Sequence, residues 1–124
     1  MKLDDYNTFC ASLPATTHVV QWGGAHVWKV GGKVFAIGGW SDSEEPHIVF
    51  KTSDLAFDIL REQKGLRPAP YLAPRGGKWI QMFEPEALPI EDLMAYLTES
   101  HRLISLKLTK KLRTELGLDD MPPK

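Results

Sequence analysis

Two fixed cations and two glycines stand directly before a tryptophan in the segment PYLAPRGGKWIQ. Gly76 and Gly77 allow the positive φ that turns consecutive backbone N–H groups toward an anion. Arg75 and Lys78 place two charges beside those groups, and Trp79 follows at once. The segment therefore predicts an anion-binding loop. An ordinary surface turn that feeds a strand is the alternative, because the GxxxxGK[ST] phosphate spacing is missing.

A second group of candidate residues comes from alternation along the expected strands. The inward residues are expected to be Trp28, Phe35, Ile48, Phe50, Ile80 and Met82. Alternation then turns four others to the opposite face of the sheet: Lys29, Lys51, Trp79 and Gln81. Two ammonium groups beside an indole and an amide suit an anionic partner with stackable bases. Exposed lysines also keep a sheet soluble, and that plainer interpretation stays open.

The C-terminal segment SHRLISLKLTKKLR carries five cations and no acid. Lys107, Lys110 and Lys111 are spaced i, i+3 and i+4, so a continuous helix would present them on one side as a row facing phosphates. Basic residues in the last turns of a helix also complement its dipole. A solvated charge cluster is therefore the alternative.

Catalytic and metal chemistry find little support in the sequence. The histidines are scattered and match neither HExxH nor HxH: His18, His26, His47 and His101. Cys10 is the only cysteine and lies on the apolar stripe of its expected helix, where a buried thiol is the common case. No GxSxG or GxGxxG motif is present. We therefore expect a non-enzymatic protein with no metal and no cofactor.

The composition is that of an ordinary globular domain. The chain has 124 residues, 43% hydrophobic and 25% charged, which predicts one domain over residues 1–124 with residues 115–124 as a flexible tail. A formal net charge of −1 and a pI of about 6.4 disfavour a strong non-specific polyanion binder, so any nucleic-acid role depends on a local patch. Because neither a membrane span nor a signal peptide is recognisable, we expect a cytoplasmic monomer.

The elements that must position these residues follow from periodicity and from the placement of glycine and proline. Helices are expected at residues 3–13, 53–63 and 89–112. Strands are expected at residues 26–30, 33–37, 47–51 and 79–83. The second helix should bury Leu55, Ile59 and Leu60. This order predicts an α+β two-layer sandwich whose helices cover one face of an antiparallel sheet and leave the other at least partly open.

The GG dipeptide between the first two expected strands is a strong hairpin signal, because both glycines can adopt the positive φ of a primed turn. A two-residue loop fixes the register. The expected cross-strand pairs are Val30 with Lys33, Lys29 with Val34, and Trp28 with Phe35. Trp28 and Phe35 should therefore form an aromatic pair on the core side.

Several segments, in the same order, resemble the MmcQ/YjbR family: VWKVGGKVFAIGG, IVFK before SDLAFDILRE, RPAPYLAPRGGKWIQM and SHRLISLKLTKKLR. The resemblance covers nearly the whole chain. It implies an α+β fold similar to that of the frataxin-like protein CyaY, and a DNA-binding role in which two hairpins act as wings. By position, the wings would be the Gly31–Gly32 hairpin and the loop before Trp79.

The leading hypothesis is a non-enzymatic module that binds DNA. The residues expected to contact it are Lys29, Lys51, Arg75, Lys78 and Trp79, extended by Lys107, Lys110 and Lys111. The alternative is a small domain that binds a protein or a metabolite and has no nucleic-acid role. Its support is the near-neutral net charge, with the PAPYL segment as an apolar docking edge.

Overall fold

The computed structural model describes residues 1–70, 72 and 77–118. Its strands are β1 (Thr16–Gln21), β2 (Ala25–Val30), β3 (Lys33–Gly39), β4 (His47–Lys51), β5 (Leu66–Pro68) and β6 (Trp79–Met82). They form one antiparallel sheet in the order β1-β2-β3-β4-β6-β5. The helices are α1 (Leu3–Ser12), α2 (Asp54–Leu60), α3 (Ile90–Ser105) and α4 (Lys110–Glu115).

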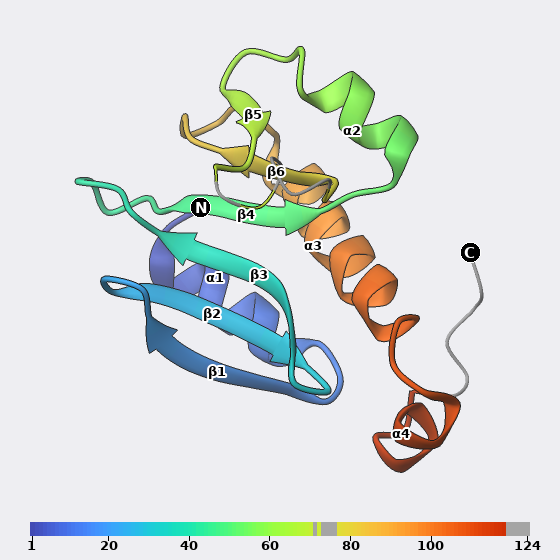
Figure 1. Ribbon diagram of the computed structural model, residues 1–124. Coiled ribbons are helices and arrows are strands. Elements are labelled where there is room, and N and C mark those ends of the chain that lie inside the picture. Colours follow the sequence, from blue (N-terminus) through green and yellow to red (C-terminus); the bar gives the residue numbers. More distant parts are fainter. Residues whose placement is uncertain (71, 73–76, 119–124) are drawn as a thin grey trace.

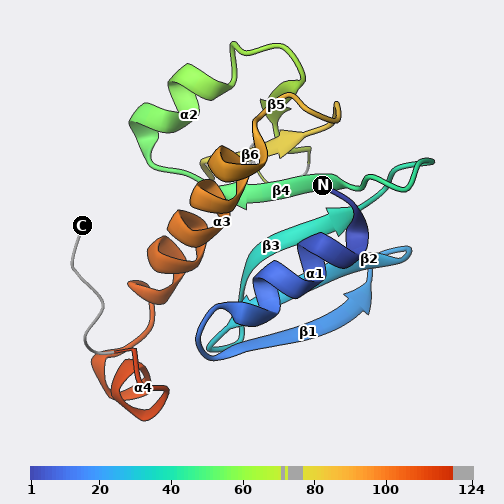
Figure 2. The same ribbon diagram turned by 180° about the vertical axis from the view of Figure 1, so that it is seen from behind.

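The main core lies between the sheet and the helices. Helices α1 and α3 cross the same face of the sheet, behind it in Figure 1 and in front of it in Figure 2. Tyr6 and Cys10 of α1, with Leu93 and Leu97 of α3, pack in the core cluster. That cluster also holds every strand residue expected to point inward: Trp28, Phe35, Ile48, Phe50, Ile80 and Met82. The α+β prediction is confirmed.

The opposite face of the sheet was expected to be at least partly open, and at its centre this is wrong. The central side chains there are buried: Val27, Ile37 and Val49. Ala69 and Leu72, which follow β5 in the chain, pack on them in a second, smaller apolar cluster. The centre of this face is covered because the segment after β5 brings its own apolar side chains back onto the sheet, whereas Lys29 and Lys51 on the same face stay partly exposed. Gln81 is buried on this face too, at 3% exposed.

Two strands of the structure were absent from the expected set. Strand β1 pairs with β2 along its whole length, from Thr16 opposite Val30 to Gln21 opposite Ala25. The three residues that join them all have positive φ: Trp22, Gly23 and Gly24. Strand β5 is only three residues long and ends in a proline, so it lies at the sheet edge beside β6.

The β2–β3 hairpin contains a bulge that shifts its register. Lys29 lies opposite Val34, as expected, but Trp28 lies opposite Ala36. The predicted pairing of Trp28 with Phe35 is therefore wrong, because Phe35 is the extra residue between the two registers. Both Phe35 and Ala36 remain in the core. The bulge thus lets two consecutive side chains face the helices.

Ser100 of α3 satisfies backbone groups on two neighbouring strands. Its hydroxyl donates to the carbonyl oxygen of Phe35 at 2.6 Å and accepts from the backbone N–H of Lys51 at 2.8 Å. The serine is fully buried. A bulge leaves backbone groups outside the ladder, and such groups need a partner when buried. Ser100 therefore fixes the end of β4, where Lys51 stands.

Helix α2 begins as expected but buries a different side. Ser53 caps it by accepting from the backbone N–H of Ala56 at 3.2 Å. Phe57 and Leu60 are buried, whereas Leu55 is 71% and Ile59 61% exposed. The predicted inward positions of Leu55 and Ile59 are wrong. The helix is seven residues long, and its buried contacts at Phe57 and Leu60 leave Leu55 and Ile59 in solvent.

The expected C-terminal helix is in fact two helices. Pro89 precedes α3 as its N-cap residue, α3 ends at Ser105, and Thr109 caps α4 by accepting from the backbone N–H of Leu112. The continuous basic row predicted for Lys107, Lys110 and Lys111 is therefore wrong, because Lys107 lies in the connection. Leu118, within the segment expected to be a tail, is buried, and residues 119–124 lie outside the described residues.

Candidate functional site

Lysines from three separate parts of the chain meet at the C-terminal end of β4, where the charges of Lys78 and Lys107 both act on Lys51. Lys51 ends that strand, Lys78 directly precedes β6, and Lys107 comes two residues after the end of α3. The pKa of Lys51 lies below its usual value, first because of burial and then because of the charge of Lys107, with a smaller effect of Lys78. Asp54 acts in the opposite direction. We call Lys51, Lys78 and Lys107 the lysine cluster.

Backbone pairing fixes two members of this cluster. Lys51 lies opposite Trp79 in the β4–β6 ladder. The carbonyl oxygen of Lys78 accepts from the backbone N–H of Thr52 at 2.7 Å and from its hydroxyl at 3.3 Å. Since Thr52 is buried, the main chain on which Lys78 stands is held firmly. The side chains are thus presented from ordered backbone.

Aromatic rings lie beneath the cations at this end of the molecule. The ammonium of Lys78 is 5.0 Å from the ring centre of Phe57, and the guanidinium of Arg61 is 5.2 Å from the same ring. The ammonium of Lys51 is 5.6 Å from the ring centre of Trp79. Contacts of this kind attract the cation to the face of the ring and so orient the side chain. Arg61 therefore extends the positive surface toward α2.

Trp79 is half-buried. Its ring packs against both apolar clusters of the protein. A Cβ on Gly77 would lie only 2.6 Å from its Cδ1 atom, so the backbone of Gly77 covers one ring edge. Lys51 stands over the ring. The indole therefore serves mainly as a platform for Lys51, and less of it is left for stacking with a partner.

The structure does not gather all the predicted residues. Lys29 lies on β2, which β3 separates from β4, so about 10 Å of sheet lies between them. Lys110 and Lys111 are exposed on α4, and neither is among the charges that act on Lys51. Arg75 and its neighbour Gly76 lie outside the described residues. Lys51, Lys78, Trp79 and Lys107 are the members that come together.

Arg67 is a charged residue that sequence analysis missed. Its Nε donates to Oε1 of Gln81 at 2.7 Å, and its guanidinium lies 4.6 Å from the ring centre of Phe83. The pKa of His47 is lowered by burial and then by Arg67, while Asp42 opposes this. The proline after Arg67 favours a loop, which is why β5 and the pairing of Arg67 with Gln81 were not expected.

The expected turn at Gly31 and Gly32 is present, with φ of 58° and 81°. At Gly31, however, the turn packs against another part of the protein. A Cβ on Gly31 would lie 2.6 Å from a methyl carbon of Leu108, which precedes α4. This hairpin tip is thus packed against the α3–α4 connection, close in sequence to Lys107.

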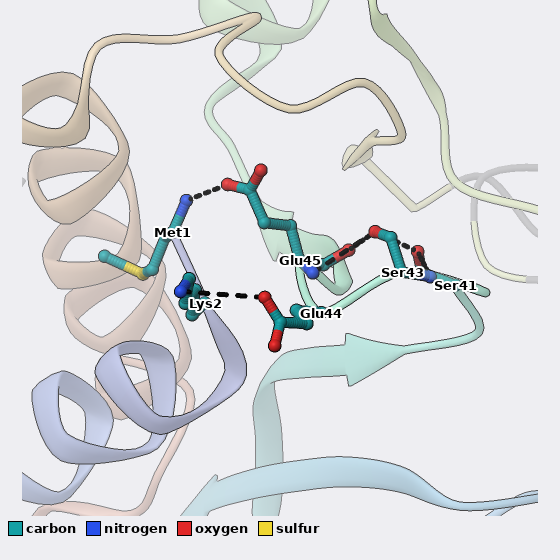
Figure 3. A network of polar contacts seen from close by, with 6 residues as sticks. All are labelled: Met1, Lys2, Ser41, Ser43, Glu44 and Glu45. Carbon is teal, nitrogen blue, oxygen red and sulfur yellow. Dashed lines mark hydrogen bonds and ion pairs between the residues drawn. The ribbon is translucent and has the colours of Figure 1, made fainter.

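The other end of β4 is acidic and tied to the N-terminal segment. The ammonium of Met1 lies 2.8 Å from Oε1 of Glu45, and Nζ of Lys2 lies 3.6 Å from Glu44 (Figure 3). Ser43 links the hydroxyl of Ser41 to the backbone of Glu45 in the same network. Acidic and basic groups thus stand at opposite ends of β4, so a net charge near zero coexists with a local positive patch.

Other reactive groups are engaged or buried. Burial raises the pKa of the Cys10 thiol to about 12. Among residues 1–70, 72 and 77–118, no three histidine, cysteine or acidic side chains gather as a metal site. No helix in this part of the chain is long and apolar enough to cross a membrane.

A YjbR family model matches residues 11–103, which is more than half of the chain. The chain belongs to the YjbR family. The matched part contains every strand and ends within α3, before Lys107. The Deinococcus radiodurans protein DR2400, described with a DUF419 domain, has a similar structure at TM-score 0.83 and 24% identity, over 97% of this chain and 91% of that one. This likeness shows the fold of the YjbR chain. No curated protein matches it.

Proposed function

We propose that this YjbR chain is a non-enzymatic module that binds nucleic acid through phosphate contacts of the lysine cluster. The observation that carries the proposal is the approach of Lys107 and Lys78 to Lys51, close enough to lower its pKa. Lysines that repel one another in the free protein gain most when an anion comes between them. In this proposal the module acts in the cytoplasm as a monomer.

The charge environment supports an anionic partner. Within the described part of the chain, no member of the lysine cluster forms an ion pair with a carboxylate. Among the described residues, Asp54 is the one acid whose charge raises the pKa of Lys51, and its effect is smaller than that of Lys107 but larger than that of Lys78. Arg61 pairs only loosely with Glu62, at 4.0 Å and on the surface. The cations are therefore available to a ligand, since exposed pairs of that kind are weak.

The half-buried indole makes phosphate contacts a better basis for binding than base stacking. Stacking platforms for single strands need free aromatic faces. Lys51 stands over Trp79, and Lys78 and Arg61 stand over Phe57. The partner we propose is therefore duplex DNA or structured RNA, recognised by backbone charge with little base preference.

A non-enzymatic role fits the state of the hydroxyl and thiol groups. Ser100 makes two hydrogen bonds to backbone groups and is fully buried, so its oxygen is not free to attack a substrate. The Cys10 thiol is buried, and a pKa of about 12 keeps it protonated. Neither group has the exposure that a nucleophile needs.

Fluorescence anisotropy with a labelled 20-base-pair duplex at low salt tests the proposal. We expect K78Q/K107Q to bind about 2- to 30-fold more weakly than the unsubstituted protein, the range for two exposed ion pairs of about 0.2 to 1 kcal/mol each. K110Q/K111Q is the matched control, because it removes the same charge from exposed lysines of α4. Equal losses in both variants, or no binding by the unsubstituted protein, would overturn the proposal.

A protein-binding role is the second candidate, and one observation favours it. Strand β1 is an edge strand with exposed Val19 and Val20, and the exposed indoles of Trp22 and Trp40 stand beside it. Edge strands with apolar side chains invite pairing with another chain. The PAPYL segment fits this role poorly, because Ala69 and Leu72 pack on the protein's own sheet. Failure of the duplex titration with retained folding would favour this candidate.

A further inference from the structure

Two histidines that are far from a motif in the sequence meet on the β1–β2 hairpin. His18 lies opposite Trp28, and His26 lies opposite Val20, so the two imidazoles are diagonal neighbours on the same face. Nε2 of His18 is 2.9 Å from Nδ1 of His26. The pair belongs to strands that β3 separates from β4 and the lysine cluster.

The surrounding hydrogen bonds show which nitrogen carries a proton. The indole N–H of Trp28 can only donate, so Oδ1 of Asn7 accepts from it at 2.9 Å, and the amide nitrogen of Asn7 faces His26. That amide nitrogen donates to Nδ1 of His26 at 3.3 Å. Nδ1 of His26 is therefore an acceptor, and Nε2 of His18 is the donor across the 2.9 Å contact. If the Nε2 proton of His18 moved to Nδ1 of the same ring, Nε2 of His18 and Nδ1 of His26 would present their lone pairs to the same space.

Both rings are held by neighbours and remain reachable from solvent. The ring of His18 stacks on that of Trp28, with centres 4.7 Å apart and planes 21° apart. Tyr6 donates its hydroxyl to the backbone carbonyl of His26 at 2.9 Å, which ties this strand to α1. His18 is exposed and His26 partly exposed. The imidazoles are thus positioned by the fold and open on one side.

We infer that His18 and His26 together chelate a divalent transition-metal ion such as Cu²⁺, Ni²⁺ or Zn²⁺. Imidazole nitrogens are ordinary ligands of these ions at about 2.0 to 2.1 Å. Two nitrogens bound at that length lie about 2.9 Å apart at a right angle and about 3.3 Å apart in a tetrahedron. The 2.9 Å separation is already within this range. Metal binding needs the Nε2 proton of His18 to move to Nδ1 through solvent, a turn of the exposed His18 ring, and release of the 3.3 Å hydrogen bond from the Asn7 amide to Nδ1 of His26.

The protein supplies two ligands to the ion, and this number determines how the ion is coordinated and how readily it exchanges. Since no third histidine, cysteine or acidic side chain joins them in the described part of the chain, water completes the coordination. The ion should be exchangeable, and the affinity should rise toward Cu²⁺ in the usual order for nitrogen ligands.

Cu²⁺ titration followed by tryptophan fluorescence and calorimetry tests the inference, because Trp28 stacks directly on one proposed ligand. We expect saturable quenching with one ion per chain, abolished in H18Q and in H26Q. H47Q is the matched control, since His47 lies on β4 away from the pair and should leave the titration unchanged. Quenching in H18Q that equals that of the unsubstituted protein would overturn the inference.

A second measurement does not depend on the variants folding. In the unsubstituted protein, Zn²⁺ should shift the ¹⁵N resonances of His18 Nε2 and His26 Nδ1 together, and those of His47 and His101 much less. Equal shifts at all four histidines would mean diffuse binding and would also overturn the site. Neither result bears on nucleic-acid binding, because no member of the lysine cluster lies on the β1–β2 hairpin that carries the two histidines.

Discussion

Substitution of Ser100 by alanine should destabilise this protein far more than its size suggests. The Ser100 hydroxyl is fully buried and makes two hydrogen bonds, to the carbonyl of Phe35 and from the N–H of Lys51. Alanine removes the one hydroxyl that makes both bonds, and so leaves the carbonyl of Phe35 and the N–H of Lys51 without a partner. Each such group costs about 1 to 3 kcal/mol, so the unfolding free energy should fall by about 2 to 6 kcal/mol.

The same helix offers a matched control. Ser105 is also fully buried, but its hydroxyl makes a single bond, to the carbonyl of His101 one turn earlier. That carbonyl belongs to an ordinary helical turn, so Ser105→Ala should cost about 1 kcal/mol or less. The contrast between the variants isolates the strand contacts from the effect of deleting a buried hydroxyl.

Urea unfolding followed by circular dichroism measures both variants. In a parallel thermal melt, a loss of about 2 to 6 kcal/mol should lower the melting temperature of a domain of this length by about 8 to 24 °C, at roughly 4 °C per kcal/mol. Similar losses in Ser100→Ala and Ser105→Ala would refute the argument that Ser100 completes the bulge and the end of β4. A change in the slope with urea would show that the denatured state had changed as well.

Two further predictions concern the hairpin turn and pH. Gly31→Ala should lower the unfolding free energy more than Gly32→Ala in urea titrations, because both have positive φ but only Gly31 lacks space for a Cβ; equal losses would contradict this. Burial lowers the pKa of His101, despite its bond to Pro14, so the folded state binds fewer protons than the unfolded state below about pH 6.5. Stability from this group is complete at least one unit above about pH 6.5 and falls as pH drops through that value. His101→Gln should flatten the fall below about pH 7.5, whereas an unchanged pH dependence would contradict the assignment.

Strand alternation and the glycine pair carried most of the correct predictions about the fold. Ile48 and Phe50 share the core face, and Ile80 and Met82 do so across the ladder, because the period of a strand is two and one face is buried. These are local rules that do not depend on the rest of the chain. They also placed Lys51 and Trp79 side by side on the opposite face.

The errors arise where a distant segment decides the local structure. The bulge at Phe35 depends on Ser100, which is 65 residues away and supplies the missing partner. The buried second face depends on Ala69 and Leu72 folding back onto it. The residue pattern within a single strand cannot predict either the bond from Ser100 or the packing of Ala69 and Leu72. Leu55 fits a helical stripe in sequence, yet α2 presents it to solvent.

The candidate sites show the same division. Lys51 and Lys78 could be associated through strand pairing, but Lys107 joins them only because α3 ends at Ser105. His18 and His26 look unrelated in sequence until β1 is recognised as a strand. The signal for β1 was present in the Gly23–Gly24 pair and the β-branched residues before it.

The dependence of duplex DNA affinity on salt tests the central claim most directly. Three lysines that neutralise phosphates contribute about −2.7 to the slope of log affinity against log salt, because each contact contributes about −0.9. The proposal predicts that K78Q/K107Q flattens the slope by about 1.8 units and that K110Q/K111Q leaves it within about 0.5 unit of the original. A slope unchanged by loss of Lys78 and Lys107 would show that the lysine cluster does not contact nucleic acid.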